Sequence, residues 1–263
     1  MSSRSIALLL AFLSTAHPSH AHAQDEMSRP GLLIINGLIG GATAAITASI
    51  HHRPIRKAAV VGAIGGATVF VGKCFIGNSR PSTDWLGQQT VAVGSSIVGN
   101  ASSGRSVLER IVLPLGPIRL YHDVKRRRTW VKLDVLETGV ATYYATKPNT
   151  SVDWDLTWKH GALILFDKTA PTNFEVAGVI KTWSRSLSIL DHEQIHVAQE
   201  QFVTTAWEDP LQEWVLPRVP GGGWVNRYFQ VGILAPVWAL ANSVITKYDR
   251  PWEKEARAVQ ARC

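Results

Sequence analysis

Apolar residues divide the chain into a helical first part and a mixed second part. Residues 31–50 and 58–76 are rich in Gly, Ala, Val and Ile, and neither run contains an ionised side chain before Lys73. Each run has about the 20 apolar residues that suffice to cross a bilayer as a helix. Because the basic segment 51–57 separates them, we expect a glycine-rich helical hairpin over residues 24–80.

This hairpin has two interpretations. Gly37 and Gly41 form a G-x-x-x-G spacing that lets two membrane helices approach closely, and the positive-inside rule would place the basic connector in the cytoplasm. Residues 31–76 are therefore a candidate membrane anchor. A peripheral hairpin packed on the main domain would have the same sequence pattern. Residues 81–104 then form a linker or an amphipathic helix.

Short β-branched and aromatic runs follow, bounded by Gly, Pro, Asn and charged residues. They predict strands at residues 118–124, 129–138, 140–146, 162–167 and 176–183. The basic run 125–128 is expected to be an exposed turn, as charge runs usually are. We expect an α+β domain over residues 105–263, in which a small antiparallel sheet precedes several helices.

A helix is predicted after these strands. The S-x-x-D sequence at residues 188–191 is a capping-box variant. Apolar residues then recur at helical spacing, with no Gly or Pro until Pro210. A shorter apolar segment at residues 231–245 is expected to be a buried or interfacial helix, because it is too short to span a bilayer.

The predicted helix carries H-E-Q-I-H at residues 192–196. Residues i and i+4 share one helix face, so His192 and His196 can direct their imidazoles to one metal ion. Glu193 follows the first histidine and can act as a general base toward a metal-bound water. Zn²⁺ is the usual ion in such a motif, and a catalytic zinc needs a third protein ligand.

Glu253 is the best candidate for the third ligand. Asp249 and Pro251 mark a helix start, as N-cap and first-turn residue, and a carboxylate in the first turn is favoured by the helix dipole. Glu255, two residues on, points to a different face and is the alternative. Lower-ranked candidates are Glu208 and Glu213.

These motifs resemble those of the glutamate zincins, zinc metallopeptidases with H-E-x-x-H and a distant Glu. More narrowly, H-E-Q-I-H-V-A-Q at 192–199 with D-R-P-W-E-K-E-A at 249–256 is similar to a bacterial exported group with H-E-x-[IV]-H-x-x-Q and N-x-F-E-x-E-A. The resemblance implies His192, His196 and Glu253 as zinc ligands and Glu193 as the base. It also implies a sheet edge that binds extended peptide, at 161–167 or 176–183.

One position departs from this family. Many glutamate zincins carry, four residues after the ligand Glu, an Asp that orients a ligand His, whereas this chain has Arg257. Arginine cannot accept that hydrogen bond. Either another group orients the histidine, or the site is weaker than in active peptidases.

The N-terminus resembles an export signal. Arg4, an apolar run and A-H-A at residues 21–23 match a secretory signal peptide over residues 1–23, so we expect a periplasmic or cell-envelope protein. The net charge is +7, but export makes nucleic acid a poor partner. Export permits a disulfide, yet we do not expect one between Cys74, inside the hairpin, and Cys263, the last residue.

The sequence therefore predicts an exported, membrane-associated zinc peptidase that hydrolyses peptides or proteins. The alternative is an envelope structural or binding protein whose zinc site is not catalytic. A third reading is an envelope protein without a metal.

Overall fold

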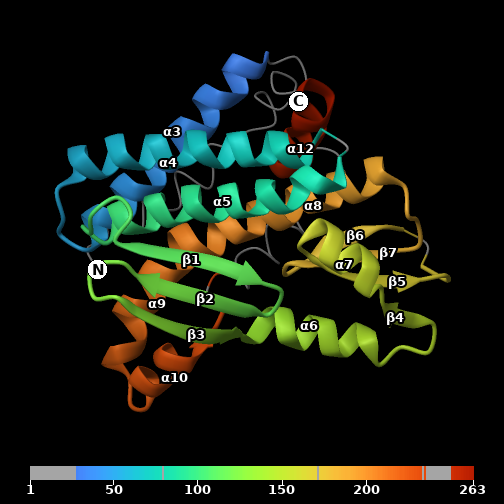
Figure 1. Ribbon diagram of the computed structural model, residues 1–263. Helices are drawn as coiled ribbons and strands as arrows, with labels where there is room; N and C mark the ends of the chain where they lie inside the picture. Colours follow the sequence, from blue (N-terminus) through green and yellow to red (C-terminus); the bar gives the residue numbers. More distant parts are fainter. Residues whose placement is uncertain (1–27, 79, 171, 233, 235–249) are drawn as a thin grey trace.

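The computed structural model describes residues 28–263 except 79, 171, 233 and 235–249 (Figure 1). The expected signal peptide at 1–23, most of the segment 231–245 and Asp249 lie outside the described residues. The expected α+β class is confirmed. The helices are α3 (Arg29–Ile50), α4 (Ile55–Ile76), α5 (Pro81–Ser102), α6 (Val135–Ala145), α7 (Trp154–His160), α8 (Leu187–Val203), α9 (Asp209–Val215), α10 (Gly222–Tyr228) and α12 (Pro251–Arg262), with a π-helical turn, η2 (Thr204–Glu208), and a 3₁₀ turn, η3 (Leu216–Arg218).

The expected hairpin is present as α3 and α4, and glycines bring its helices together. A Cβ atom added at Gly41 would lie 2.9 Å from the carbonyl oxygen of Ala59, and one added at Gly40 would lie 2.4 Å from that of Gly62. Contacts below about 3 Å leave no room for a side chain, so only glycine permits this backbone approach.

A second close contact joins α4 to α5. A Cβ added at Gly65 would lie 2.7 Å from the carbonyl oxygen of Gly94, and one at Gly72 would lie 2.7 Å from that of Gly87. Since the two glycines on each helix are seven residues apart, both pairs meet along one antiparallel seam. Residues 81–104 thus contain a central helix, α5, whose Val91 and Val98 are fully buried.

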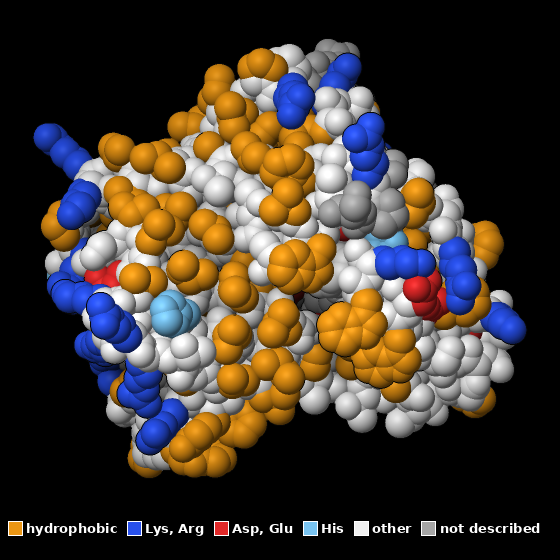
Figure 2. Space-filling view, viewed as in Figure 1, with side chains coloured by type: hydrophobic (Ala, Val, Ile, Leu, Met, Phe, Trp, Pro, Cys, Tyr) orange, Lys and Arg blue, Asp and Glu red, His pale blue; other side chains and the backbone are white. Residues whose placement is uncertain are grey.

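The hairpin packs on the body of the protein. Both α3 and α4 are long and apolar enough to cross a membrane, with mean hydropathies of 1.7 and 1.8, yet 39% and 50% of those windows are buried inside the protein. On the other side, α5 contacts β1, η2 and α8. Figure 2 shows apolar side chains over this helical layer. The exposed large apolar side chains of the hairpin are Leu33, Ile34, Leu38, Ile39, Ile55, Val60, Ile64 and Val71.

The strands form two mixed sheets of four strands each. The first has the order β1-β2-β3-β8, with only β3 and β8 parallel, and the second has the order β4-β5-β7-β6, with only β5 and β7 parallel. The strands are β1 (Arg110–Leu115), β2 (Ile118–Asp123), β3 (Arg128–Asp134), β4 (Thr150–Val152), β5 (Leu163–Asp167), β6 (Phe174–Val176), β7 (Val179–Thr182) and β8 (Phe229–Gln230). The basic run 125–128 is exposed, as expected, and lies in the turn between β2 and β3 and at the first residue of β3.

The prediction of a strand at 140–146 is wrong, because these residues belong mostly to α6. Strand β3 ends at Asp134, whose side chain accepts a hydrogen bond from the backbone N–H of Glu137 at 3.0 Å. This contact caps the new helix. The β-branched and aromatic residues of 140–145 therefore belong to the helix that this cap begins.

Helix α8 connects the two halves of the molecule (Figure 1). Its Ile195 and Ala198 belong to an apolar cluster with α3, α4, α5 and α12. Its Leu190 packs in another cluster with α7, β5 and β7. Because both of its sides are covered, α8 holds a fixed position between the helical layer and the second sheet.

The expectation for the cysteines is wrong: Cys74 and Cys263 form a disulfide across 189 residues of sequence. The end of α12 packs on the end of α4, where Val259 shares an apolar cluster with Cys74 and Ile76. This packing brings the last residue of the chain beside the hairpin. The pairing is set by the tertiary contact and leaves no mark in the local sequence.

Candidate metal site

The helix predicted to start at the S-x-x-D sequence 188–191 is confirmed as α8, with a different start. The helix begins at Leu187, and its N-cap Ser186 makes no side-chain capping bond, so the expected S-x-x-D cap does not form. Leu190, Ile195 and Ala198 are fully buried. Their burial fixes the rotation of α8 and therefore the direction of the histidines.

His192, His196 and Glu253 come together as a group that could hold a metal ion. The Nε2 atoms of the two imidazoles lie 3.3 Å apart, and Glu253 Oε2 lies 3.3 Å from His192 Nε2 and 3.5 Å from His196 Nε2. A tetrahedral ion with bonds of about 2.0–2.1 Å needs ligands about 3.3–3.4 Å apart. The three separations match one face of such a tetrahedron.

Helix α12 supplies Glu253 from its first turn. Pro251 begins the helix, as expected, and its N-cap is Arg250, which makes no side-chain cap. The N-terminal helix dipole favours a carboxylate there. Burial raises the pKa of Glu253, but the close contacts and charges of His192 and His196 outweigh burial and hold this pKa well below its usual range. Glu253 is therefore charged and ready to bind a cation.

Gln199 orients one of the histidines. Its Oε1 lies 2.8 Å from His196 Nδ1, which is hydrogen-bonding distance, so Nδ1–H donates and Nε2 faces the metal position. Outer partners of this kind fix the tautomer and ring direction of ligand histidines. The acceptor that is missing at Arg257 is therefore replaced by a residue of α8 itself. The H-x-x-Q spacing was the available sequence signal for it.

Glu255, the alternative ligand, lies outside this group. It accepts hydrogen bonds from Lys73 Nζ at 2.6 Å and from Gln199 Nε2 at 2.7 Å. The lower-ranked candidates also bind elsewhere: Glu208 accepts from the backbone N–H of Leu234, and Glu213 pairs with Arg105 and Arg110. Of the candidate carboxylates, Glu253 alone joins the two histidines.

Glu193, the expected base, is buried beside the site, with 7% of its surface exposed. Sequence reasoning missed Glu175 of β6, which interacts with both Glu193 and His196. Burial, then the charge of Glu200, raise the pKa of Glu175, and Glu193 raises it further while His196 lowers it. Strand β6 has only three residues, which is too short a run to be recognised as a strand in the sequence, so nothing pointed to Glu175.

The sheet edge beside α8 is β6. We expected the edge at 161–167 or 176–183, and this is wrong for β5 and β7, the main strands of those two ranges. Both are interior strands, because β5 lies between β4 and β7, and β7 lies between β5 and β6. The intervening β6 was not predicted. It packs against α8, and within the described part of the chain it pairs with β7 alone.

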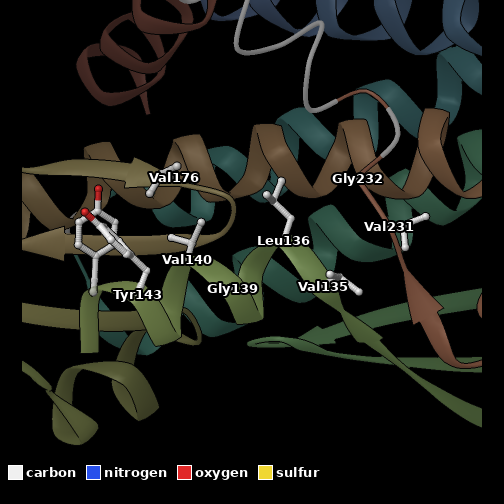
Figure 3. Close-up of a pocket in the computed structure, with 9 residues that line it drawn as sticks. Val135, Leu136, Gly139, Val140, Tyr143, Val176, Val231 and Gly232 are labelled. Atoms are coloured by element: carbon white, nitrogen blue, oxygen red, sulfur yellow. The ribbon is translucent and has the colours of Figure 1, made fainter. Parts of the chain in front are cut away.

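An apolar cavity of about 500 Å³ opens next to this edge (Figure 3). Val176 contributes to it from the end of β6, directly after Glu175. Most other lining residues come from α6, with two from the segment after β8. They are Val135, Leu136, Gly139, Val140, Tyr143, Tyr144, Val231 and Gly232.

A second group that could hold a metal comprises Asp84, His160 and Asp191, all fully buried. His160 Nδ1 and Asp84 Oδ2 lie 2.5 Å apart. This is a short hydrogen bond, closer than the about 3.3 Å between two ligands of one tetrahedral ion. The pair thus bonds α7 to α5, and the geometry favours a metal at His192, His196 and Glu253 instead.

Comparisons of the chain with protein-family models, with curated proteins and with solved structures find no match. The site's function is therefore inferred from its own residues and geometry.

Proposed function

We propose that this protein is an exported zinc peptidase that hydrolyses peptide bonds with a metal-activated water. The observation that carries the proposal is the triangle of His192 Nε2, His196 Nε2 and Glu253 Oε2, with separations of 3.3, 3.3 and 3.5 Å. Two imidazoles and one carboxylate, with a fourth position left for water, are the ligand set of a catalytic zinc.

Zinc in this position would lower the pKa of water to about 7 and polarise the scissile carbonyl. The chain supplies the proton transfer. Glu193, next to His192 on α8, takes a proton from the attacking water and passes it to the leaving amine. Gln199 keeps the His196 ring directed at the site through its 2.8 Å contact with Nδ1.

Strand β6 suits an extended peptide as substrate. It is a sheet edge packed on the α8 helix that carries the histidines, and an edge strand can pair with a peptide main chain while accepting many side chains. The cavity beside Val176 is apolar. We therefore expect a preference for substrates with a large apolar side chain near the cleaved bond.

A zinc site that only staples the fold is the competing function. Two other contacts already hold α12, namely the Cys74–Cys263 disulfide and the Lys73–Glu255 ion pair at 2.6 Å. A third clamp is not needed to fix the helix, which favours catalysis. Removal of zinc by a chelator distinguishes the two functions, since a staple predicts loss of folding.

The proposed location is the surface of the cell-envelope membrane. The outer face of the hairpin exposes Leu38 and Ile64, by 65% and 57%, and basic Arg53, Arg56 and Lys57 are exposed at its connector. An apolar face with a basic border suits a bilayer that contains anionic lipid. Because the hairpin packs on α5, we expect this face to lie on the membrane.

The test is Glu193→Gln, which keeps the shape of the side chain and removes the base. We expect the variant to bind one zinc per chain, by elemental analysis, and to lose hydrolysis of a mixed peptide library read by mass spectrometry. The matched control is Asp155→Asn, on exposed Asp155 of α7, which should keep both properties. Undiminished hydrolysis by Glu193→Gln contradicts the proposed mechanism, and no hydrolysis by the zinc-loaded parent favours the staple.

A further inference from the structure

A continuous chain of hydrogen bonds leads from the metal site into the hairpin. His196 Nδ1 lies 2.8 Å from Gln199 Oε1, and Gln199 Nε2 lies 2.7 Å from Glu255 Oε2. Lys73 Nζ then lies 2.6 Å from Glu255 Oε1 and 3.1 Å from Asn36 Oδ1. Residues of α8, α12, α4 and α3 are thus connected by direct contacts.

Two acceptors set the orientation of the Gln199 amide. An amide has one end that accepts and one that donates. Gln199 Nε2 donates both to Glu255 Oε2 and to the carbonyl oxygen of Trp252, at 2.7 and 3.0 Å. These two acceptors direct Oε1 toward His196, where it can receive only Nδ1–H. That tautomer leaves the Nε2 lone pair free for a metal.

Lys73 explains how the carboxylate of Glu255 is held. Its side chain is 5% exposed, and that of Glu255 is 13% exposed. A buried charge is retained only when it is paired. Lys73 neutralises Glu255 and fixes one of its oxygens, which leaves the other oxygen for Gln199.

We propose that Glu255, held by Lys73, is a positioning residue that selects the tautomer of His196 through Gln199. The inference rests on the proposed metal site but concerns a residue outside the ligand group. It assigns the hairpin a role in metal binding, because α4 supplies the counter-charge. The ion pair is therefore more than a tether for α12.

The experiment compares two neutral double variants, Lys73→Met/Glu255→Gln and Lys73→Met/Glu255→Leu. Both lack the ion pair, and Gln and Leu are similar in size, but only Gln keeps an acceptor for Gln199. We expect the Gln variant to bind zinc within a few-fold of the parent. The Leu variant should bind about tenfold more weakly, the lower end for lost outer partners, since the Trp252 carbonyl still holds the amide.

A second comparison asks whether Glu255 acts through Gln199. When Gln199→Leu is added to each double variant, the difference in zinc affinity between them should vanish, as it does for residues in one network. Equal affinities of the two double variants, or a difference that survives Gln199→Leu, would overturn the proposal. Circular dichroism checks that each variant folds.

The tautomer is read directly by ¹⁵N spectroscopy of labelled histidines in the zinc-free chain, at alkaline pH where the imidazoles are neutral. We expect His196 as Nδ1–H in the parent, and observation of Nε2–H overturns the proposal even if the leucine variant fails to fold. A parent chain that binds no zinc would refute the proposed function, while the tautomer would still test this inference.

Discussion

His192 Nε2 and Glu253 Oε2 lie 3.3 Å apart, although 61 positions separate them in the sequence. The contact spans the interface between α8 and α12, so it exists only when both helices are docked. Glu255, on the same helix, is turned toward Lys73 instead. The two glutamates therefore have different roles, and their substitution should have different effects.

Glu253→Gln should weaken zinc binding by more than the about 10- to 100-fold that loss of an outer partner costs. The substitution removes the charge that draws the cation and leaves a poor ligand in its place. Competition with a chromophoric chelator measures the affinity. Arg262→Ala, at the exposed end of α12, is the control and should bind zinc normally. Parental affinity in Glu253→Gln would exclude Glu253 as a ligand.

Cys263→Ser should lower the free energy of unfolding by about 2–4 kcal/mol under oxidising conditions, because the cross-link with Cys74 limits the unfolded chain. Denaturant titrations with and without a reductant measure the change. Reductant should destabilise the parent to a similar degree and leave the variant unchanged. A parent that does not respond to reductant, with two thiols accessible to alkylation, would argue against the disulfide.

Gly94→Ala should destabilise the protein by about 1–3 kcal/mol, the usual range for overpacking. Its added Cβ would lie 2.7 Å from the carbonyl oxygen of Gly65 and from the backbone nitrogen of Val69, so α4 and α5 would have to separate. Gly139→Ala is the matched control in α6, where nothing lies within 4 Å of the added atom. This control should be stabilised by about 0.5–1 kcal/mol. If thermal unfolding showed Gly94→Ala to be as stable as the parent, the close contact between α4 and α5 at Gly94 would be contradicted.

Glu213 should make the protein sensitive to acid. Burial raises its pKa, but Arg110 and Arg105 outweigh burial and lower the pKa from 4.5 to about 2. A carboxyl group with a depressed folded-state pKa contributes stability above pH 4.5 that is lost as the pH falls toward 2. At neutral pH this contribution is at most about 3 kcal/mol.

Glu213→Gln should therefore reduce stability near pH 7 and flatten the decline between pH 4.5 and 2. Urea titrations at several pH values test this. If the variant and the parent lose stability in parallel over that interval, the ion pairs of Glu213 do not cause the acid sensitivity.

The local sequence was sufficient to predict features that depend on residues within one helical turn. The i,i+4 spacing of His192 and His196 predicted their shared face, and Pro251 predicted the start of α12. The local sequence was insufficient where a helix cap competed with the strand preference of the residues that follow it. The D-x-x-E spacing of Asp134 and Glu137 begins α6 and overrides the β-branched and aromatic character of the residues that follow.

Two edge strands, β1 and β6, were also not predicted from the sequence. β1 was missed because Pro114 interrupts its apolar run, although proline is tolerated in an edge strand such as this one. β6 was missed because it has only three residues. Its identity as the edge beside α8 depends on which strands pair, and strand order is not encoded in any one segment.

From the sequence by itself followed the α+β class, the glycine-rich hairpin and a helix that presents two histidines, because each depends on residues within a few turns of one another. The tertiary structure decided that Glu253 and not Glu255 joins the histidines, that Gln199 replaces the acceptor absent at Arg257, and that Lys73 lies beside Glu255 across 182 positions. These choices depend on how α3, α4, α8 and α12 pack together. Contacts between distant segments reflect the burial of the whole core, which no local pattern contains.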